Sequence, residues 1–522
     1  MSEKRHITRA VGSLGSATLV SRIAGLVRDM VIASQFGAGL LTDAFFMAFT
    51  LPNLLRRFFA EGSLTAAFVP TYTEVFHTQG EAEARRVATI CWTLLLLVMF
   101  GVTIVGMLAS PLIVKGIGYG FQGIPGKLEL TTTLTRVMFP FILFVSLLSL
   151  VTGILNVRGH YFLPAFSPVF LNLSMIGCTL LLSSQFEIPI MALAIGVLLG
   201  GLLQLGMQFP LLFSLGYRPS FNWSFRHPAV VRITRLMLPG IAGVAIYQIN
   251  IVVSRLLASF LPQGSVSYLY YGQRLFEFPQ GIVIASLAQA LLPAMSRQMT
   301  ANDTAGFKDS LRFSFEVLLL LILPATIGLI LFAVPVYSLF FMSGQFSFDA
   351  VSQSSYALMA YAPGLLFVGV SRVVVPAFYS LKDTRTPVWI SFWTLIVNLL
   401  AGIVLMQRFS HVGLAIALTI ASLFNALVLI FLLRRRIGTL SLGSLTGSFV
   451  RILPGLILMA LVTRTVLAFG DWENPLYKLQ NSLILTAAIL LGGIVYLATC
   501  RLFGVAILSE LRELVRRKQR RE

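Results

Sequence analysis

The sequence is poor in charge. Only 11% of its 522 residues are Asp, Glu, Lys or Arg, whereas soluble domains contain about 25%. Hydrophobic residues make up 57% of the chain, and the mean hydropathy is +0.86. This composition excludes a soluble globular protein and indicates an integral membrane protein.

The sequence also lacks the patterns of disulfide-bonded and metal-binding proteins. Its three cysteines, Cys91, Cys178 and Cys500, lie far apart in apolar runs, so they define neither a disulfide framework nor a metal-ligand spacing. The five histidines are never at ligand spacing from one another: His6, His77, His160, His227 and His411. We therefore expect no metal centre and no bound metal cofactor.

Long polar segments are missing as well, so an extramembrane catalytic domain has no place in the chain. The apolar runs have the length of about 20 residues that a membrane-spanning helix needs. They predict an all-α, polytopic membrane protein with about fourteen transmembrane helices. The expected spans are 10–36, 40–70, 86–114, 131–156, 163–184, 188–214, 230–261, 266–296, 311–341, 352–380, 387–407, 411–433, 448–469 and 480–504.

Acidic residues are scarce relative to basic ones. Lys and Arg number 39, Asp and Glu only 20, and the net charge is +19. The basic residues gather in every second predicted loop, as in cytoplasmic loops that follow the positive-inside rule. This pattern explains the positive charge without a nucleic-acid partner. It predicts an even number of spans, with both termini in the cytoplasm.

A faint internal repeat indicates two similar halves. Residues 33–42 resemble residues 258–267 at the positions of small and hydroxyl side chains, 225 residues later. An even number of expected spans separates the copies, so the halves have the same orientation, as parallel repeats do. We expect an N-terminal six-helix bundle at 1–220, a C-terminal six-helix bundle at 221–440, a helix pair at 441–505 and a basic cytoplasmic tail at 506–522.

The apolar segment 21–70 carries several arginines at possible membrane depth. Each costs about 2.5–3.5 kcal/mol at the centre of a membrane helix by insertion scales, so these side chains need a wet cavity or a bound anion. Ser21 and Arg28 share one helical stripe, and Asn53 and Arg56 are i, i+3 neighbours.

Four arginines outnumber the acids placed to neutralise them: Arg22, Arg28, Arg56 and Arg274. A positive cluster in a low dielectric favours a bound anion, and guanidinium groups match a phosphate or diphosphate. The alternative is internal ion pairing, which stays open for Arg28 with Asp29 and for Arg57 with Glu61, the latter at i, i+4 spacing. We assign Arg56 to the anion and the Arg57–Glu61 pair to local structure.

A cation site is the second candidate. Asp383 is followed by Thr384 and Thr386 at a loop, and Asn398 lies in the next span. Carboxylate, hydroxyl and amide oxygens are ligands for a hard cation such as Na⁺. A loop turn capped by Asp383 is the alternative.

Five segments carry a resemblance to a known family: SRIAGLVRD, FGAGLLTDAFF, LPNLLRRFFAEGSLTAAFVP, YGQRLFEFPQG and AFYSLKDTRTP. They resemble the MurJ (MviN) family of lipid II flippases, within the multidrug/oligosaccharidyl-lipid/polysaccharide (MOP) exporter superfamily. The resemblance covers nearly the whole chain. It implies fourteen helices in the bacterial inner membrane, with two six-helix bundles in a V around a cationic cavity and a last helix pair that forms a groove for the lipid tail.

The resemblance also implies a function and a site. The family moves lipid II, an undecaprenyl-diphosphate-linked disaccharide-peptide, from the cytoplasmic to the periplasmic leaflet; no bond is broken, so the protein is expected to be a transporter and not an enzyme. The residues that match the family's substrate cavity are Ser21, Arg22, Arg28, Asp43, Asn53, Arg56, Arg274 and Glu277.

The resemblance matches the family's ion-coupling site only in part. Asp383 matches the family's proposed sodium site, but Gln248 and Asn250 stand where a second carboxylate is expected. Coupling to Na⁺ or to the membrane potential therefore stays open. We expect a functional monomer that contacts membrane lipids and works beside cell-wall synthesis and division proteins.

Two other functions are kept as alternatives. A related exporter of drugs or of another polyprenyl-diphosphate polysaccharide would share the fold, but is expected to lack the LPNLLRRFFAEG and QRLFEFPQG segments. A membrane-embedded polyprenyl-phosphate transferase would need acidic residues at a membrane face to hold a metal and a nucleotide donor, and the sequence contains no such cluster.

Overall fold

The structure, a computed structural model, describes residues 3–58, 64–218, 220–438, 442–508 and 510. Within these residues every regular element is a helix, which confirms the all-α prediction. The predicted basic tail lies mostly outside the described residues. The chain divides into two compact units, Met1–Val266 and Ser267–Glu522, each with its own packing.

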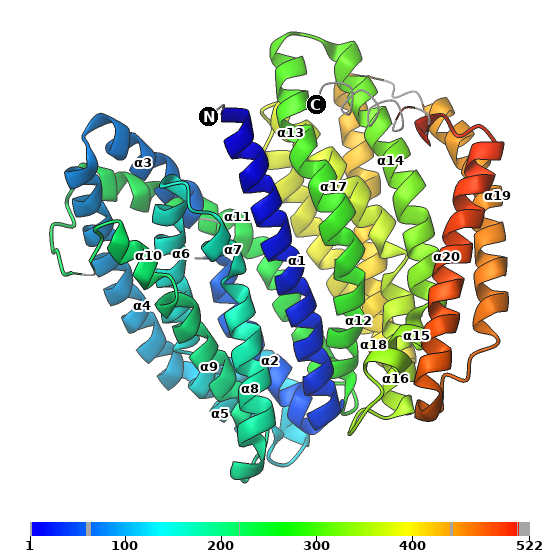
Figure 1. Ribbon diagram of the computed structural model, residues 1–522, viewed down its shortest axis with the longest axis horizontal. Helices are drawn as coiled ribbons and strands as arrows, with labels where there is room; N and C mark the ends of the chain where they lie inside the picture. Colours follow the sequence, from blue (N-terminus) through cyan, green and yellow to red (C-terminus); the bar gives the residue numbers. More distant parts are fainter. Residues whose placement is uncertain (1–2, 59–63, 219, 439–441, 509, 511–522) are drawn as a thin grey trace. The chain divides into compact units, whose positions relative to one another are not determined.

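The first unit runs from blue to green in Figure 1. Its elements are α1 (Glu3–Phe36), α2 (Leu40–Phe58), α3 (Leu64–Thr78), α4 (Glu81–Ile117), η2 (Tyr119–Gly123), α5 (Lys127–Met138), α6 (Phe141–Val157), α7 (Phe162–Phe166), α8 (Pro168–Leu182), η3 (Ser183–Gln185), α9 (Met191–Gly206), α10 (Phe209–Ser214) and α11 (Pro228–Ser259).

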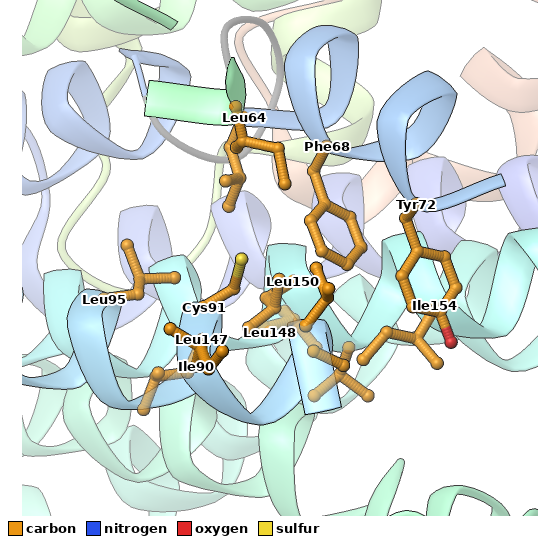
Figure 2. Close-up of a cluster of buried hydrophobic side chains, with 14 of the residues drawn as sticks. Leu64, Phe68, Tyr72, Ile90, Cys91, Leu95, Leu147, Leu148, Leu150 and Ile154 are labelled. Atoms are coloured by element: carbon orange, nitrogen blue, oxygen red, sulfur yellow. The ribbon is translucent and has the colours of Figure 1, made fainter. Parts of the chain in front are cut away.

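A hydrophobic core joins α3, α4 and α6 (Figure 2). Phe68 and Tyr72 stack on α3, with ring centroids 4.9 Å apart, above Ile90 of α4 and Leu150 of α6. The start of α11 belongs to the same core through Val230. Because α11 packs on α2, α3 and α4, the boundary between these two compact units falls after α11. The six-helix bundles expected at 1–220 and 221–440 stay a prediction.

The second unit runs from green to red. Its elements are α12 (Ser265–Pro279, which starts at the boundary), η4 (Gln280–Ile284), α13 (Ala285–Thr300), α14 (Thr304–Leu331), α15 (Ala333–Phe340), α16 (Phe348–Tyr361), α17 (Gly364–Ser380), α18 (Arg385–Ile437), α19 (Leu442–Leu467), η5 (Pro475–Tyr477) and α20 (Lys478–Leu502). A π-helical turn, η4, follows Pro279 directly.

Helix α18 folds back on itself. Its 53 residues would form a straight helix of about 80 Å, more than twice the ~30 Å hydrocarbon core. Ser410 breaks it with φ 52° and ψ −135°. The Asn425 side-chain amide donates to the Thr394 hydroxyl at 2.8 Å, so the two halves lie side by side and antiparallel. These halves correspond to the predicted spans 387–407 and 411–433.

The last two long helices, α19 and α20, pack against each other and against α14. Leu456 of α19 and Tyr496 of α20 meet Val317 of α14 in a small core, and the Tyr496 hydroxyl donates to the Leu320 carbonyl at 2.6 Å. The expected helix pair at 441–505 is therefore an integral part of the second unit.

The chain is a polytopic membrane protein. Among the described residues, nine helices are long and apolar enough to cross a membrane, or ten if the bent pair α16–α17 forms one span. Helix α18 counts once in this number although it folds back at Ser410. The total of fourteen spans stays a prediction.

Candidate functional site

Arg28 lies in a buried polar junction between α1 and α8. Its Nε and Nη2 donate to Asp29 Oδ1 at 3.0 and 2.6 Å, and its Nη1 donates to Asn172 Oδ1 at 2.9 Å. The Asn172 amide in turn donates to the Ser21 carbonyl at 3.3 Å. The structure thus brings Ser21 and Arg28 together, as their helical spacing predicts. It also supports the alternative reading of an ion pair for Arg28 and Asp29.

Asn172 is a polar residue of this junction that the sequence did not single out. It is only 5% exposed and lies in the apolar helix α8. The only available signal was an amide within an apolar run, where a buried polar group needs a partner. Its partner Arg28 is 144 residues away in sequence, so helical spacing could not reveal the pairing.

Arg22 is less buried than Arg28. It forms no hydrogen bond or ion pair with any other described residue. A half-exposed guanidinium without a protein counter-charge keeps its donors available for an anionic ligand.

On α2, the structure confirms the predicted contact between Asn53 and Arg56. Arg56 Nε donates to Asn53 Oδ1 at 3.2 Å, one turn after Pro52, which lies inside the helix. Arg57 points elsewhere, and its Nε is buried without a hydrogen-bond acceptor among the described residues. Glu61 lies outside the described residues, so the predicted Arg57–Glu61 pair stays a prediction.

Asp43 lies in a setting that the sequence did not suggest. Its carboxylate pairs with Lys127 Nζ at 2.8 Å and accepts the Gly264 N–H at 2.8 Å. The ammonium of Lys127 also lies 4.1 Å from the centre of the Phe121 ring, a cation–π contact. Both charged side chains are 1% exposed. Asp43 therefore joins the starts of α2 and α5 to the segment before α12.

In the second unit, Arg274 and Glu277 lie one turn apart on α12, as predicted. Arg274 Nη1 is 3.3 Å from Glu277 Oε2. Its Nε and Nη2 donate to the Tyr270 hydroxyl at 3.2 and 2.7 Å. Both charged side chains remain about one-third exposed, at 34% and 39%. This guanidinium is oriented by its neighbours and is still accessible.

Asp383 caps the start of α18. Its Oδ1 accepts the N–H groups of Arg385 and Thr386 at 3.1 and 3.0 Å, and its Oδ2 accepts the Thr386 hydroxyl at 2.6 Å. Arg436 Nη2 is 2.7 Å from Oδ2. Burial raises the pKa of the Asp383 carboxyl, but these hydrogen bonds and the Arg436 charge outweigh it, so the pKa lies below its usual range.

The proposed cation ligands Asp383 and Asn398 do not meet. Asn398 is buried in α18, about 20 Å along the axis from Arg385 at 1.5 Å per residue. The Asp383 carboxylate is already occupied by four donors, as the capping alternative predicts. One ion cannot bind both residues. Among the described residues, no group of three or more His, Cys, Asp and Glu is placed to hold a metal ion.

The second unit also contains an apolar cavity of about 370 Å³. It lies among α12, α14, α15, α19 and α20, and its lining is almost entirely hydrocarbon. Leu275 and Phe278 of α12, close to Arg274 in sequence, line one side, and Gly492 and Gly493 of α20 line another. A long hydrocarbon chain fits this lining, whereas a charged group does not.

Comparison with known proteins identifies the family. A family model described as "Lipid II flippase MurJ" matches residues 32–490. A probable lipid II flippase MurJ of Vibrio cholerae serotype O1 is 37% identical over 512 residues, which cover 95% of each chain. The lipid II flippase MurJ of Burkholderia cenocepacia is 34% identical over 435 residues, 83% of this chain and 84% of the relative.

Solved structures agree with this result. A structure of lipid II flippase MurJ in an inward closed conformation is 26% identical, covers 96% of this chain and 99% of its own, and has a TM-score of 0.78. An inward-facing multidrug resistance MATE family transporter of the MOP superfamily is 14% identical, covers 83% of this chain and 98% of its own, and has a TM-score of 0.68, which shows a common fold. The chain belongs to the MurJ family.

Proposed function

We propose that this protein moves lipid II from the cytoplasmic to the periplasmic leaflet of the bacterial inner membrane by alternating access. Membership of the MurJ family over residues 32–490 is the observation that carries the proposal. The structure adds two features that a lipid diphosphate requires, namely arginines placed on helices α1, α2 and α12 and an apolar cavity in the second unit. The protein acts as a transporter and makes or breaks no bond.

Arginines in each unit offer donors to the diphosphate. Arg22 and Arg56 offer half-exposed guanidinium groups on α1 and α2, and Arg274 offers one on α12. Guanidinium forks bind phosphate oxygens bidentately. Arg28 is more deeply buried and bonded to Asp29 and Asn172, so its role is to hold the neighbouring backbone of α1 and to add positive potential. Asn53 orients Arg56.

The polyprenyl tail occupies the apolar cavity between α12, α14, α15, α19 and α20. The cavity of about 370 Å³ is too small for the whole tail, so it takes only part of it. The tail leaves the hydrocarbon of the bilayer and not water, so this transfer brings little hydrophobic gain, and the apolar lining avoids any polar cost.

The membrane potential drives the cycle. Both termini lie in the cytoplasm, and the anionic diphosphate moves outward, away from the negative interior, so an inside-negative potential favours this step by about 2.3 kcal/mol per charge per 100 mV. The emptied arginine site is drawn back in the opposite direction. Asp383 serves as a helix cap in this account, and Na⁺ coupling through it is the alternative. The protein functions as a monomer beside the cell-wall synthesis and division proteins.

Leaflet-resolved transport of lipid II by the purified protein in liposomes tests the proposal. We expect outward movement that speeds up under an inside-negative potential and is unaffected by a metal chelator. A transferase should fail with chelator. If lipid II does not change leaflet while another polyprenyl-diphosphate glycolipid does, the alternative exporter function is correct.

A further inference from the structure

Arg274 is held on two sides by neighbours on its own helix. Nε and Nη2 both donate to the Tyr270 hydroxyl, at 3.2 and 2.7 Å, and the guanidinium carbon lies 4.9 Å from the centre of the Tyr270 ring. The Tyr270 side chain therefore contacts Arg274 through its ring and through its hydroxyl. With one edge fixed, the planar guanidinium has a defined orientation.

The other edge of the guanidinium faces Glu277. Arg274 Nη1 and Glu277 Oε2 are 3.3 Å apart. This distance exceeds that of a good charge-assisted hydrogen bond, which is about 2.7–2.9 Å. Both side chains are about one-third exposed, at 34% and 39%, so water or a ligand can reach this pair. An accessible, long ion pair is weak and readily exchanged.

We propose that Tyr270 is the positioning residue of Arg274, and that Glu277 is a resident anion which the substrate diphosphate displaces from it. The inference rests on the proposed function, in which Arg274 binds the diphosphate. Tyr270 keeps the Nε–Nη2 edge in place in both states. Arg274 Nη1 pairs with the Glu277 carboxylate when the site is empty and with a phosphate oxygen when the substrate is bound.

This exchange explains why an acid stands beside an arginine that binds an anion. Without Glu277, the empty site would carry an uncompensated charge at membrane depth, which is costly. With it, the charge is partly neutralised before binding and after release. The carboxylate therefore lowers the affinity for the diphosphate and helps to expel it, which favours turnover.

The test is binding of undecaprenyl diphosphate to the full-length protein in detergent, combined with lipid II transport in liposomes. Tyr270→Phe removes only the hydroxyl and should weaken binding roughly five- to tenfold, which is the size expected for one ordinary hydrogen bond. Tyr271→Phe is the matched control, because this neighbouring tyrosine is buried and packs on Phe341 and Phe346. It should bind like the unmodified protein.

Two further variants separate a positioning role from a structural one. In an Arg274→Lys background, Tyr270→Phe should cause no additional loss, because it acts through the guanidinium. Glu277→Gln should bind undecaprenyl diphosphate roughly threefold more tightly, as expected when a competing charge is removed, and should transport lipid II more slowly. A merely structural pair would not produce tighter binding together with slower transport.

Three results would overturn the inference: unchanged affinity of Tyr270→Phe, an equal loss in the Arg274→Lys background, or weaker binding by Glu277→Gln. If Arg274→Ala itself binds undecaprenyl diphosphate like the unmodified protein, the assignment of Arg274 in the proposed function fails as well. If Arg274→Ala loses binding while Tyr270→Phe does not, only the inference about Tyr270 and Glu277 fails.

Discussion

Two ion pairs in this protein each involve a residue that was predicted to line the substrate cavity, Asp43 in one pair and Arg274 with Glu277 in the other. Asp43–Lys127 is 2.8 Å long, and both side chains are 1% exposed. Arg274–Glu277 is 3.3 Å long, and both side chains are about one-third exposed. The two pairs therefore differ in burial and in length. Asp43 and Lys127 are enclosed and join two helices, whereas Arg274 and Glu277 leave room for a ligand.

Charge at membrane depth is compensated in two different ways in these pairs. A charged residue at membrane depth needs compensation, and either a protein partner or a substrate can supply it. Asp43 has a lysine, a backbone N–H and no contact with open space. The Arg274 side chain retains exposure that an anion can use. Mutation of the Asp43 pair should therefore lower stability, whereas mutation of the Arg274 pair should impair transport.

The largest expected effect is on the enclosed pair. Lys127→Met should lower the free energy of unfolding by about 3–5 kcal/mol, because it leaves the Asp43 carboxylate buried without its counter-charge. Thermal unfolding of the purified protein in detergent measures this. The double variant Asp43→Asn with Lys127→Met removes both charges and should recover most of the loss. A single variant as stable as the unmodified protein would mean that water reaches Asp43.

Two adjacent glycines at the apolar cavity allow a test of whether it binds the polyprenyl tail. A Cβ on Gly493 would meet no atom within 4 Å, whereas one on Gly492 would lie 2.5 Å from the Thr463 hydroxyl. Gly493→Leu should therefore fill the cavity and slow transport of long-chain substrates roughly tenfold more than that of short-chain analogues, as overpacking costs about 1–3 kcal/mol.

Gly492→Ala is the matched control for this experiment. Its added methyl group would press on Thr463 of α19 and disturb the packing of α19 against α20. We expect it to reduce stability and to affect long-chain and short-chain substrates equally. Equal losses for both substrates in Gly493→Leu would show that the cavity does not hold the tail.

A smaller effect is expected at the cap of α18. Asp383→Ala should cost about 1 kcal/mol of stability at neutral pH, the usual value for a lost N-cap. Because the folded pKa of Asp383 lies below its unfolded value, this stabilisation is present above pH ~4 and is lost as the pH falls through the folded pKa. Unfolding of the two proteins should therefore converge in acid. Transport that becomes insensitive to Na⁺ in this variant would instead favour the cation-site alternative.

Local patterns predicted much of the fold. Hydropathy gave the all-helical class and the two halves of α18, and helical spacing gave the Asn53–Arg56 and Arg274–Glu277 contacts. These features depend on residues within one helix or on the polarity of a continuous stretch. Both are local properties that a sequence displays directly.

Contacts between distant residues were not predictable in the same way. Asp43 and Lys127 are 84 residues apart, and Arg28 and Asn172 are 144 apart. Their pairing depends on how α5 and α8 pack, which a periodic pattern does not encode. The same reason explains the boundary between the units, since the packing of α11 on α3 and α4 is a tertiary contact.

The most direct test of the account compares Arg56 and Arg57, which are adjacent on α2 and point about 100° apart. Arg56 is placed beside Asn53, and Arg57 is assigned to local structure. Lipid II transport in liposomes should be abolished by Arg56→Ala and strongly reduced by Arg56→Lys, which keeps the charge but loses the bidentate fork. Arg57→Ala should transport normally. Normal transport by Arg56→Ala, or a loss confined to Arg57→Ala, would contradict the account.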